Sequence, residues 1–249
     1  MEACDGVILS SSSSASSKVK GSDPLLLENE MNLVHAAKQV GLCRILKVSC
    51  SQGLLGESSS VALGRAHWQI EQQIREMRGS FEGSVDFVRP NTMMDAFLHG
   101  RMHEMVCGRT ISVSIKSGKI AFVHPMDVAE GVVKLLTQNS KPSEDIGEFN
   151  LAGPEALTYA QVAKIFSEQL DQRVRYSYFP LWAVQTSLWI KGVRSDEISS
   201  YIELANALER GAEAHVDAST LQELLGKAPR SFARFVHENK DKWPLMSYK

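Results

Sequence analysis

The sequence predicts an α/β protein with a mostly parallel sheet, followed by a small and mainly helical C-terminal lobe. Two observations lead to this fold class. In the first half, short runs rich in Val, Ile and Leu alternate with helical patterns, and from Trp182 onward the pattern is helical. Repeated strand–helix–strand units are typical of a parallel sheet with helices on both faces. We therefore expect a sheet domain over residues 1–150 and a second lobe over residues 151–249.

The elements of the first half follow from apolar runs and their end signals. Gly41 is placed to end a helix, and Pro90, which lacks a backbone N–H, is placed to end a strand. A serine-rich polar loop over residues 10–23 separates the first strand from the first helix. The expected elements are strands at residues 7–9, 43–49 and 85–90 and helices at residues 28–39 and about 61–77.

The second half mixes strand and helix signals. Two apolar runs flank residues 116–118, which predicts a β-hairpin. Asp127 and Thr158 are residue types that cap helix N-termini, so each is expected to begin a helix. Further short strands are expected at residues 149–151 and 173–179, and from Trp182 the pattern is helical to the end.

Composition narrows the function classes. The net charge of −2 gives no electrostatic attraction to nucleic acid or to an anionic membrane. The longest apolar stretch, FPLWAVQTSLWI, is too short and too polar to span a bilayer. Four dispersed cysteines show no metal-ligand spacing and indicate reduced thiols, so no metal site is expected. The expected compartment is the cytoplasm.

Six stretches in order resemble the NmrA-like family of atypical short-chain dehydrogenase/reductases. They are NLVHAAKQVGLCRILKVSCS, GRAHWQIEQQIRE, VDFVRPNTMMDAF, KIAFVHPMDVAEGVVKLL, EFNLAGPEALTYAQVAKIF and GKAPRSFARFVHEN. The resemblance implies a Rossmann-type domain that binds NAD or NADP, plus a small substrate lobe. It also implies that Val7–Leu9 is the family's fourth strand, so the chain looks N-terminally truncated. We then expect Val7–Leu9 at a sheet edge and weak NADPH binding, because the family's G-x-x-G-x-x-G phosphate turn is not present.

One loop resembles a phosphate loop. GLLGESS, residues 53–59, follows a strand and precedes a helix, but Ser59 occupies the third glycine position. The next strand also lacks an acidic residue at its end to bind a ribose hydroxyl. An ordinary loop is therefore favoured.

The resemblance also bears on catalysis. Reducing members of the superfamily carry a Tyr-x-x-x-Lys pair, and here Leu63 and His67 occupy those two positions. Leucine transfers no proton. His67 is a candidate catalytic acid or a contact to the cofactor. The alternative is that His67 pairs with Glu71 on the helix surface.

Other candidate site residues follow strand ends, because ligands of open parallel sheets lie beyond the carboxyl ends of strands. Ordinary loop or core roles remain the alternatives for all of them. Candidate cofactor contacts are Ser10, Ser11, Ser49, Cys50, Ser51, His67, Pro90, Asn91 and Thr92, and candidate substrate contacts are Met93, Met94 and Phe97.

Three functions remain open from the sequence. The first is an NAD(P)H-dependent oxidoreductase of a small carbonyl or quinone-like acceptor. The second is a non-catalytic dinucleotide-sensing protein, which would act through a protein partner and is favoured by the missing tyrosine. The third is a truncated paralogue that binds no dinucleotide.

Overall fold

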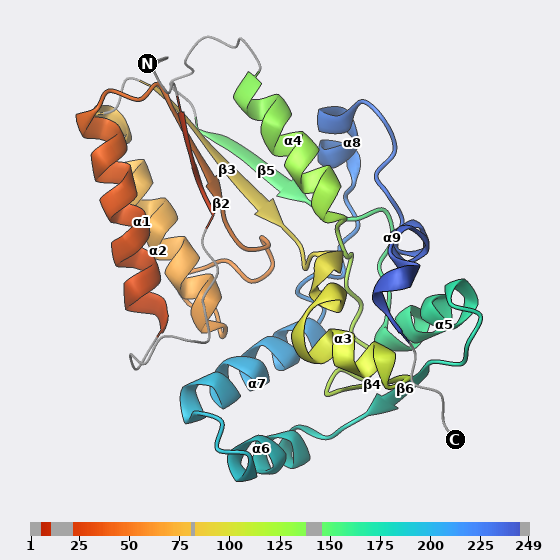
Figure 1. Cartoon of the computed structure of the whole chain (residues 1–249). Coiled ribbons are helices and arrows are strands. Elements are labelled where there is room, and N and C mark those ends of the chain that lie inside the picture. Colours follow the sequence, from red (N-terminus) through yellow and green to blue (C-terminus); the bar gives the residue numbers. More distant parts are fainter. Residues whose placement is uncertain (1–5, 11–21, 81–82, 138–145, 245–249) are drawn as a thin grey trace.

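The computed structural model describes residues 6–10, 22–80, 83–137 and 146–244. Within them, four parallel strands form one sheet in the order β1-β2-β3-β5 (Figure 1). The expected position of residues 7–9 at a sheet edge is confirmed, because β1 pairs only with β2 in the described part of the chain. The strands are β1 (Gly6–Leu9), β2 (Arg44–Val48), β3 (Ser84–Pro90) and β5 (Gly147–Leu151).

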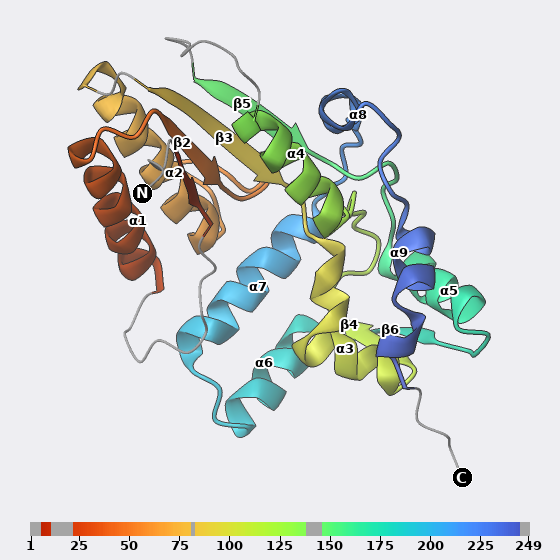
Figure 2. The ribbon, with the colours of Figure 1, turned by 45° about the horizontal axis from the view of Figure 1, so that its top comes forward.

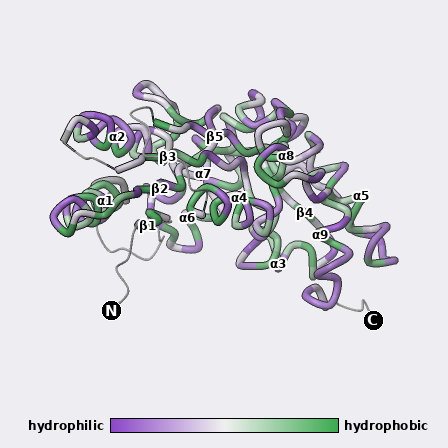
Figure 3. The backbone as a smooth tube through the Cα atoms, turned by 90° about the horizontal axis from the view of Figure 1, so that it is seen from above, coloured by the Kyte–Doolittle hydropathy of each residue, from purple (hydrophilic) through white to green (hydrophobic). Residues whose placement is uncertain are grey.

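One face of the sheet is covered by α1 (Ser22–Gln39) and α2 (Ala62–Met77). Viewed from above, these two helices lie side by side against the strands (Figure 3). Apolar side chains at helical spacing on α2 pack against inward side chains of β2 and β3. The loop after α1 turns at Gly41, whose φ of +69° suits glycine. The core of this face includes Leu9, Val34, Ile45, Ala66, Ile70, Ile74 and Phe87.

The opposite face is covered by α4 (Pro125–Thr137) and α8 (Ser219–Leu225). Successive strand residues point to opposite faces, so Leu46 and Val88 enter this second core while Ile45 and Phe87 enter the first. The helix α8 ends at Gly226, with φ +68°. Because both faces of the sheet are covered, β2 and β3 carry buried apolar residues on both of their sides.

A second lobe lies beyond the carboxyl ends of the strands (Figures 1 and 2). Its core is a cluster of edge-to-face aromatic rings around Phe97 and Phe232, whose centroids are 5.3 Å apart. A two-stranded parallel sheet, β4 with β6, completes it. The elements are η2 (Met94–Leu98), α3 (Gly100–Cys107), β4 (Thr110–Val113), α5 (Tyr159–Gln169), β6 (Arg175–Tyr178), α6 (Leu181–Ile190), α7 (Ser195–Glu209) and α9 (Phe232–Glu238).

The two cores are interleaved along the sequence. η2, α3 and β4 come before residue 150 but pack in the second lobe, and α8 comes after it but packs on the sheet. A single boundary after residue 150 therefore does not separate the two cores. The chain crosses between them more than once.

The expected hairpin at residues 116–118 is wrong. β4 pairs in parallel with β6 instead. The backbone N–H groups of Lys116, Ser117 and Gly118 donate to the carboxylate of Glu209, with a shortest N···O distance of 2.6 Å. A carboxylate from α7 thus satisfies the donors that a hairpin would have paired.

The two expected helix caps differ in outcome. Thr158 caps α5 in a capping box with Gln161, as expected. Asp127 lies inside the first turn of α4, and its carboxylate accepts from the backbone N–H of Arg230 at 2.7 Å and pairs with that arginine's side chain.

The described helices include none that is both long and apolar enough to cross a membrane.

Candidate functional site

The carboxyl ends of the parallel strands define the candidate site. All four strands run in one direction, so residues that follow β2 and β3 meet at the edge of the sheet that faces the second lobe (Figure 1). Ser49 is held there by a hydrogen bond from its N–H to the carbonyl oxygen of Val88, at 2.7 Å. This edge brings the expected residues after β2 beside those after β3.

A buried carboxylate joins the two strand ends. Glu213, in the turn after α7, accepts a hydrogen bond from Ser51 Oγ at 2.7 Å and from the backbone N–H of Thr92 at 2.9 Å. Its side chain is buried. Sequence reasoning missed Glu213, because its partners lie more than a hundred residues away in the chain. Ser51 and Thr92 are therefore engaged in fixing the site.

Two buried polar atoms near this edge have no hydrogen-bond partner in the described part of the chain. They are Oγ of Ser49 and Nδ1 of His67. Burial first, and the positive charge of Lys47 second, together lower the pKa of His67 to about 3. The imidazole is therefore neutral at pH 7. Buried polar groups are normally hydrogen-bonded, so both atoms are candidates for a ligand contact.

The alternative interpretation of His67 and Glu71 as a pair on the helix surface is wrong. Both side chains are buried, and Glu71 forms a two-bond ion pair with Arg89 on β3, at 3.1 and 2.6 Å. Arg75, one turn beyond, pairs with Glu148 at 2.5 Å. Glu71 thus anchors α2 to the sheet and leaves His67 free to face a different partner.

A second buried ion pair lies near His67. Lys47 on β2 is fully buried and donates to Glu30 of α1 at 2.9 Å and to the carbonyl oxygen of Val48 at 2.6 Å. Burial lowers the pKa of Lys47, and Glu30 opposes that shift. The second carboxylate oxygen of Glu30 has no partner in the described residues. The lysine charge contributes to keeping His67 neutral.

The remaining candidate cofactor contacts have mixed locations. Ser10 is exposed at the end of β1, and Ser11 lies outside the described residues. Cys50 is buried beside Leu54, and burial raises the pKa of its thiol to about 12, so it is no nucleophile. Pro90 is the last residue of β3 and is buried. The side chain of Asn91 donates to the carbonyl oxygen of Ala121 at 3.3 Å.

The expected substrate contacts need a correction. Met94 and Phe97 are 0% and 1% exposed in the aromatic core of the second lobe. The backbone oxygen of Phe97 also accepts from Trp243 Nε1 at 2.8 Å. These two side chains have no surface for a ligand and serve packing. Met93 is half-buried and joins the core beside α4.

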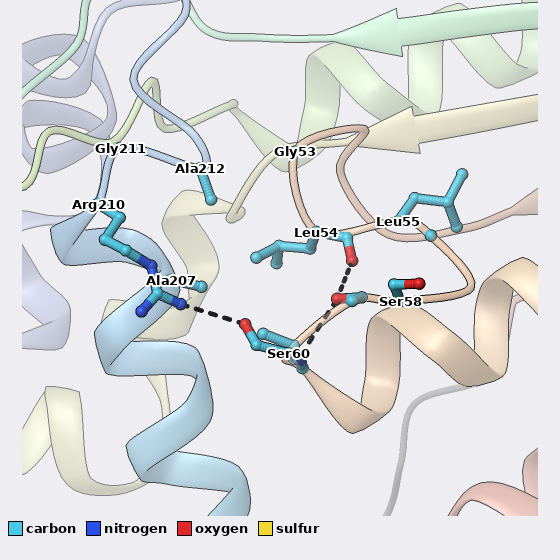
Figure 4. A pocket seen from close by; sticks show the side chains of 12 residues that line it. Gly53, Leu54, Leu55, Ser58, Ser60, Ala207, Arg210, Gly211 and Ala212 are labelled. Carbon is cyan, nitrogen blue, oxygen red and sulfur yellow. Dashed lines mark hydrogen bonds between the residues drawn. The ribbon is translucent and has the colours of Figure 1, made fainter.

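A groove opens next to the strand ends (Figure 4). It has a volume of about 480 Å³ and lies between the loop after β2 and the end of α7. A Cβ on Gly53 would lie 1.7 Å from the carbonyl oxygen of Ala212, so this glycine permits the close approach of the two segments. Ser59 donates to the carbonyl oxygen of Leu54 at 2.6 Å and accepts from the N–H of Val61 at 3.1 Å. The glycine and serine thus serve the loop's own structure, as expected for an ordinary loop.

The fold and the site at its strand ends define a Rossmann-type α/β protein, and comparison with known proteins gives the family. The NmrA-like family model matches residues 8–233, so the chain belongs to the NmrA-like family. Agroclavine dehydrogenase of Claviceps fusiformis is 27% identical over 219 residues, which cover 86% of this chain and 70% of that protein. The uncharacterized oxidoreductase YesF of Bacillus subtilis (strain 168) is 30% identical over 209 residues, which cover 83% and 67% of the two proteins.

A solved structure has the same fold. Citrobacter sp. triphenylmethane reductase complexed with NADP(H) superimposes with a TM-score of 0.74 and 19% identity, covering 94% of this chain and 76% of that one. The expected Rossmann-type fold and family are confirmed.

Proposed function

We propose that this protein is an NADP(H)- or NAD(H)-dependent oxidoreductase of a small carbonyl or quinone-like acceptor. Membership of the NmrA-like family supports the proposal, as do relatives named dehydrogenase and oxidoreductase. The observation that carries it is that two buried polar atoms near the carboxyl ends of parallel strands, Ser49 Oγ and His67 Nδ1, have no hydrogen-bond partner among the described residues. Ligands of open α/β sheets bind at such ends.

These atoms fit the nicotinamide end of a dinucleotide. Neutral His67 presents a ring nitrogen that accepts a hydrogen bond from a ribose hydroxyl. The hydroxyl of Ser49 both donates and accepts. When bound, the cofactor supplies the hydride, and these residues would hold and orient its ribose.

Neither of the two residues at the family's tyrosine and lysine positions, Leu63 and His67, is an acidic donor for the proton that the acceptor needs. Leu63, one turn before His67, packs against the apolar cores on either side of it. His67 is neutral at pH 7, because its pKa is about 3. We therefore assign His67 to cofactor positioning. This site therefore best suits an acceptor whose reduced anion is stabilised by conjugation and takes its proton from water. This condition favours quinones over simple ketones.

The test is oxidation of NADPH and NADH by menadione, with benzaldehyde as the carbonyl acceptor. We expect faster turnover with menadione, and a rise of about tenfold in the KM for cofactor in His67→Leu from the loss of a buried hydrogen bond. His35→Leu, at an exposed position on α1, is the matched control and keeps the wild-type KM. Equal changes in the KM for cofactor in the two variants would show that His67 is not part of the cofactor site.

A dinucleotide-sensing protein is the second candidate, and Leu63 in place of the proton-donating tyrosine favours it. The two functions separate in the same experiment. A sensor binds NADPH without oxidising it in the presence of either acceptor, whereas the proposed enzyme turns over.

A further inference from the structure

We propose that the groove beside the strand ends binds an anionic group on an apolar molecule, and that Arg210 recognises its charge. The groove is lined by residues 53–56, 58–61, 207 and 210–212 (Figure 4). Among the described residues that line the groove, Arg210 alone carries a formal charge. The inference rests on the proposed function and adds the charge class of the acceptor.

Arg210 has no carboxylate partner within the described residues, although two acids lie near it on α7. Glu209, its neighbour in the chain, accepts from the backbone N–H groups of residues 116–118. Glu203, two turns earlier, accepts from the backbone N–H of Ala62 at 3.0 Å. Both acids are thus engaged elsewhere, and no carboxylate of the described residues forms an ion pair with the guanidinium at the groove.

The single bond that Arg210 makes leaves donors available. Its Nη2 donates to Ser60 Oγ at 3.2 Å, which links α7 to the loop after β2 (Figure 4). The other N–H groups of the guanidinium fork match two oxygens of a carboxylate, sulfonate or phosphate. The hydroxyl of Ser60 accepts from Arg210 and keeps its own proton to donate to the same anion.

Part of the groove is apolar. Leu55 and Ala212 are half-buried in its lining, and they pack on a small buried cluster that contains Leu54, Val61 and Ala207. The groove lies next to the candidate cofactor site, because its lining residue Ala212 directly precedes Glu213, which holds Ser51. An acceptor lying at the strand ends would therefore extend an acidic substituent toward Arg210.

The test measures binding by calorimetry with the full chain and no dinucleotide. The probes are naphthalene-2-sulfonate and the neutral naphthalene-2-sulfonamide, which have nearly the same shape. We expect the sulfonate to bind about tenfold tighter, from charge-assisted hydrogen bonds to Arg210. Arg210→Gln removes this preference, Arg210→Lys retains part of it, and Arg173→Gln, at an exposed site after α5, leaves it intact.

Three results would overturn the inference: equal binding of the two probes, an unchanged preference in Arg210→Gln, or no saturable binding of the sulfonate. Because neither cofactor nor turnover enters the experiment, its outcome is independent of the proposed function. Tighter binding of the sulfonate in a protein that does not oxidise NADPH would support the anion site and contradict the proposed enzymatic function.

Discussion

Replacing Glu213 by alanine tests whether one carboxylate fixes the two strand ends of the site. The change removes hydrogen bonds from Ser51 Oγ at 2.7 Å and from the Thr92 N–H at 2.9 Å. Hydrogen bonds to a charged group contribute about 1.5–3 kcal/mol each, and water that enters from the adjoining groove offsets part of the loss. We expect Glu213→Ala to lower the free energy of unfolding by about 2–4 kcal/mol.

The assay is urea unfolding followed by circular dichroism, with an unchanged m-value showing that only stability changed. Ser51→Ala, which removes one of the two bonds, should cost about 1–2 kcal/mol. In the double variant, the loss of unfolding free energy should be about 1 kcal/mol smaller than the sum of the two single losses. The reason is that both single changes delete the hydrogen bond between Ser51 and Glu213. A loss below about 0.5 kcal/mol for Glu213→Ala, or full additivity, would refute the reasoning.

Three further predictions concern single buried side chains. The pKa of His67 is about 3 in the folded protein against its ordinary 6.5, so only the unfolded chain takes up this proton between those values. Between pH 7 and pH 5, the free energy of unfolding of the wild type, measured in urea, should therefore fall by about 2 kcal/mol more than that of His67→Gln. Equal losses would contradict this. Iodoacetamide at mildly alkaline pH should label exposed Cys43 and spare Cys50, whose thiol pKa is about 12; peptide mass spectrometry that finds both labelled would contradict this. Phe97→Ala should cost about 3–5 kcal/mol of unfolding free energy and Phe97→Leu less, and a loss near zero for alanine would remove Phe97 from the core.

The sheet was predictable because its signals are local. Val, Ile and Leu runs at β2 and β3 identify buried strands without knowledge of their neighbours. Gly41 ends a helix through its own backbone conformation, and Thr158 caps one through a residue three positions away. Such features depend on short stretches of chain, so the sequence displays them.

The errors all depend on contacts between distant residues. The apolar run at β4 predicts a hairpin with the next run, but its partner β6 lies more than sixty residues further along the chain. Met94 and Phe97 are apolar residues after a strand, a pattern that fits a pocket wall and a core equally well. The i, i+4 spacing of His67 and Glu71 is typical of a surface pair, but the partner of Glu71 is Arg89, which belongs to the next strand.

The candidate site was therefore found only in part. The positions after β2 and β3 are predicted because ligands of open parallel sheets bind beyond the carboxyl ends of the strands. His67 is predicted by the family resemblance. Glu213 and Arg210 come from the turn and helix end after α7, which the sequence does not place beside the strands. Their roles depend on how the second lobe folds back on the sheet.

The most direct test of the central claim, that the strand ends hold the nicotinamide half of the cofactor, is saturation-transfer difference NMR of NADP⁺ with the purified chain. The method reports which ligand protons lie against the protein and works for weak binding. We predict that the nicotinamide and adjacent ribose protons receive the strongest saturation, the adenine protons less, and that His67→Leu lowers the nicotinamide signal. Strongest saturation on the adenine, or no transfer to any proton of the dinucleotide, would contradict the account.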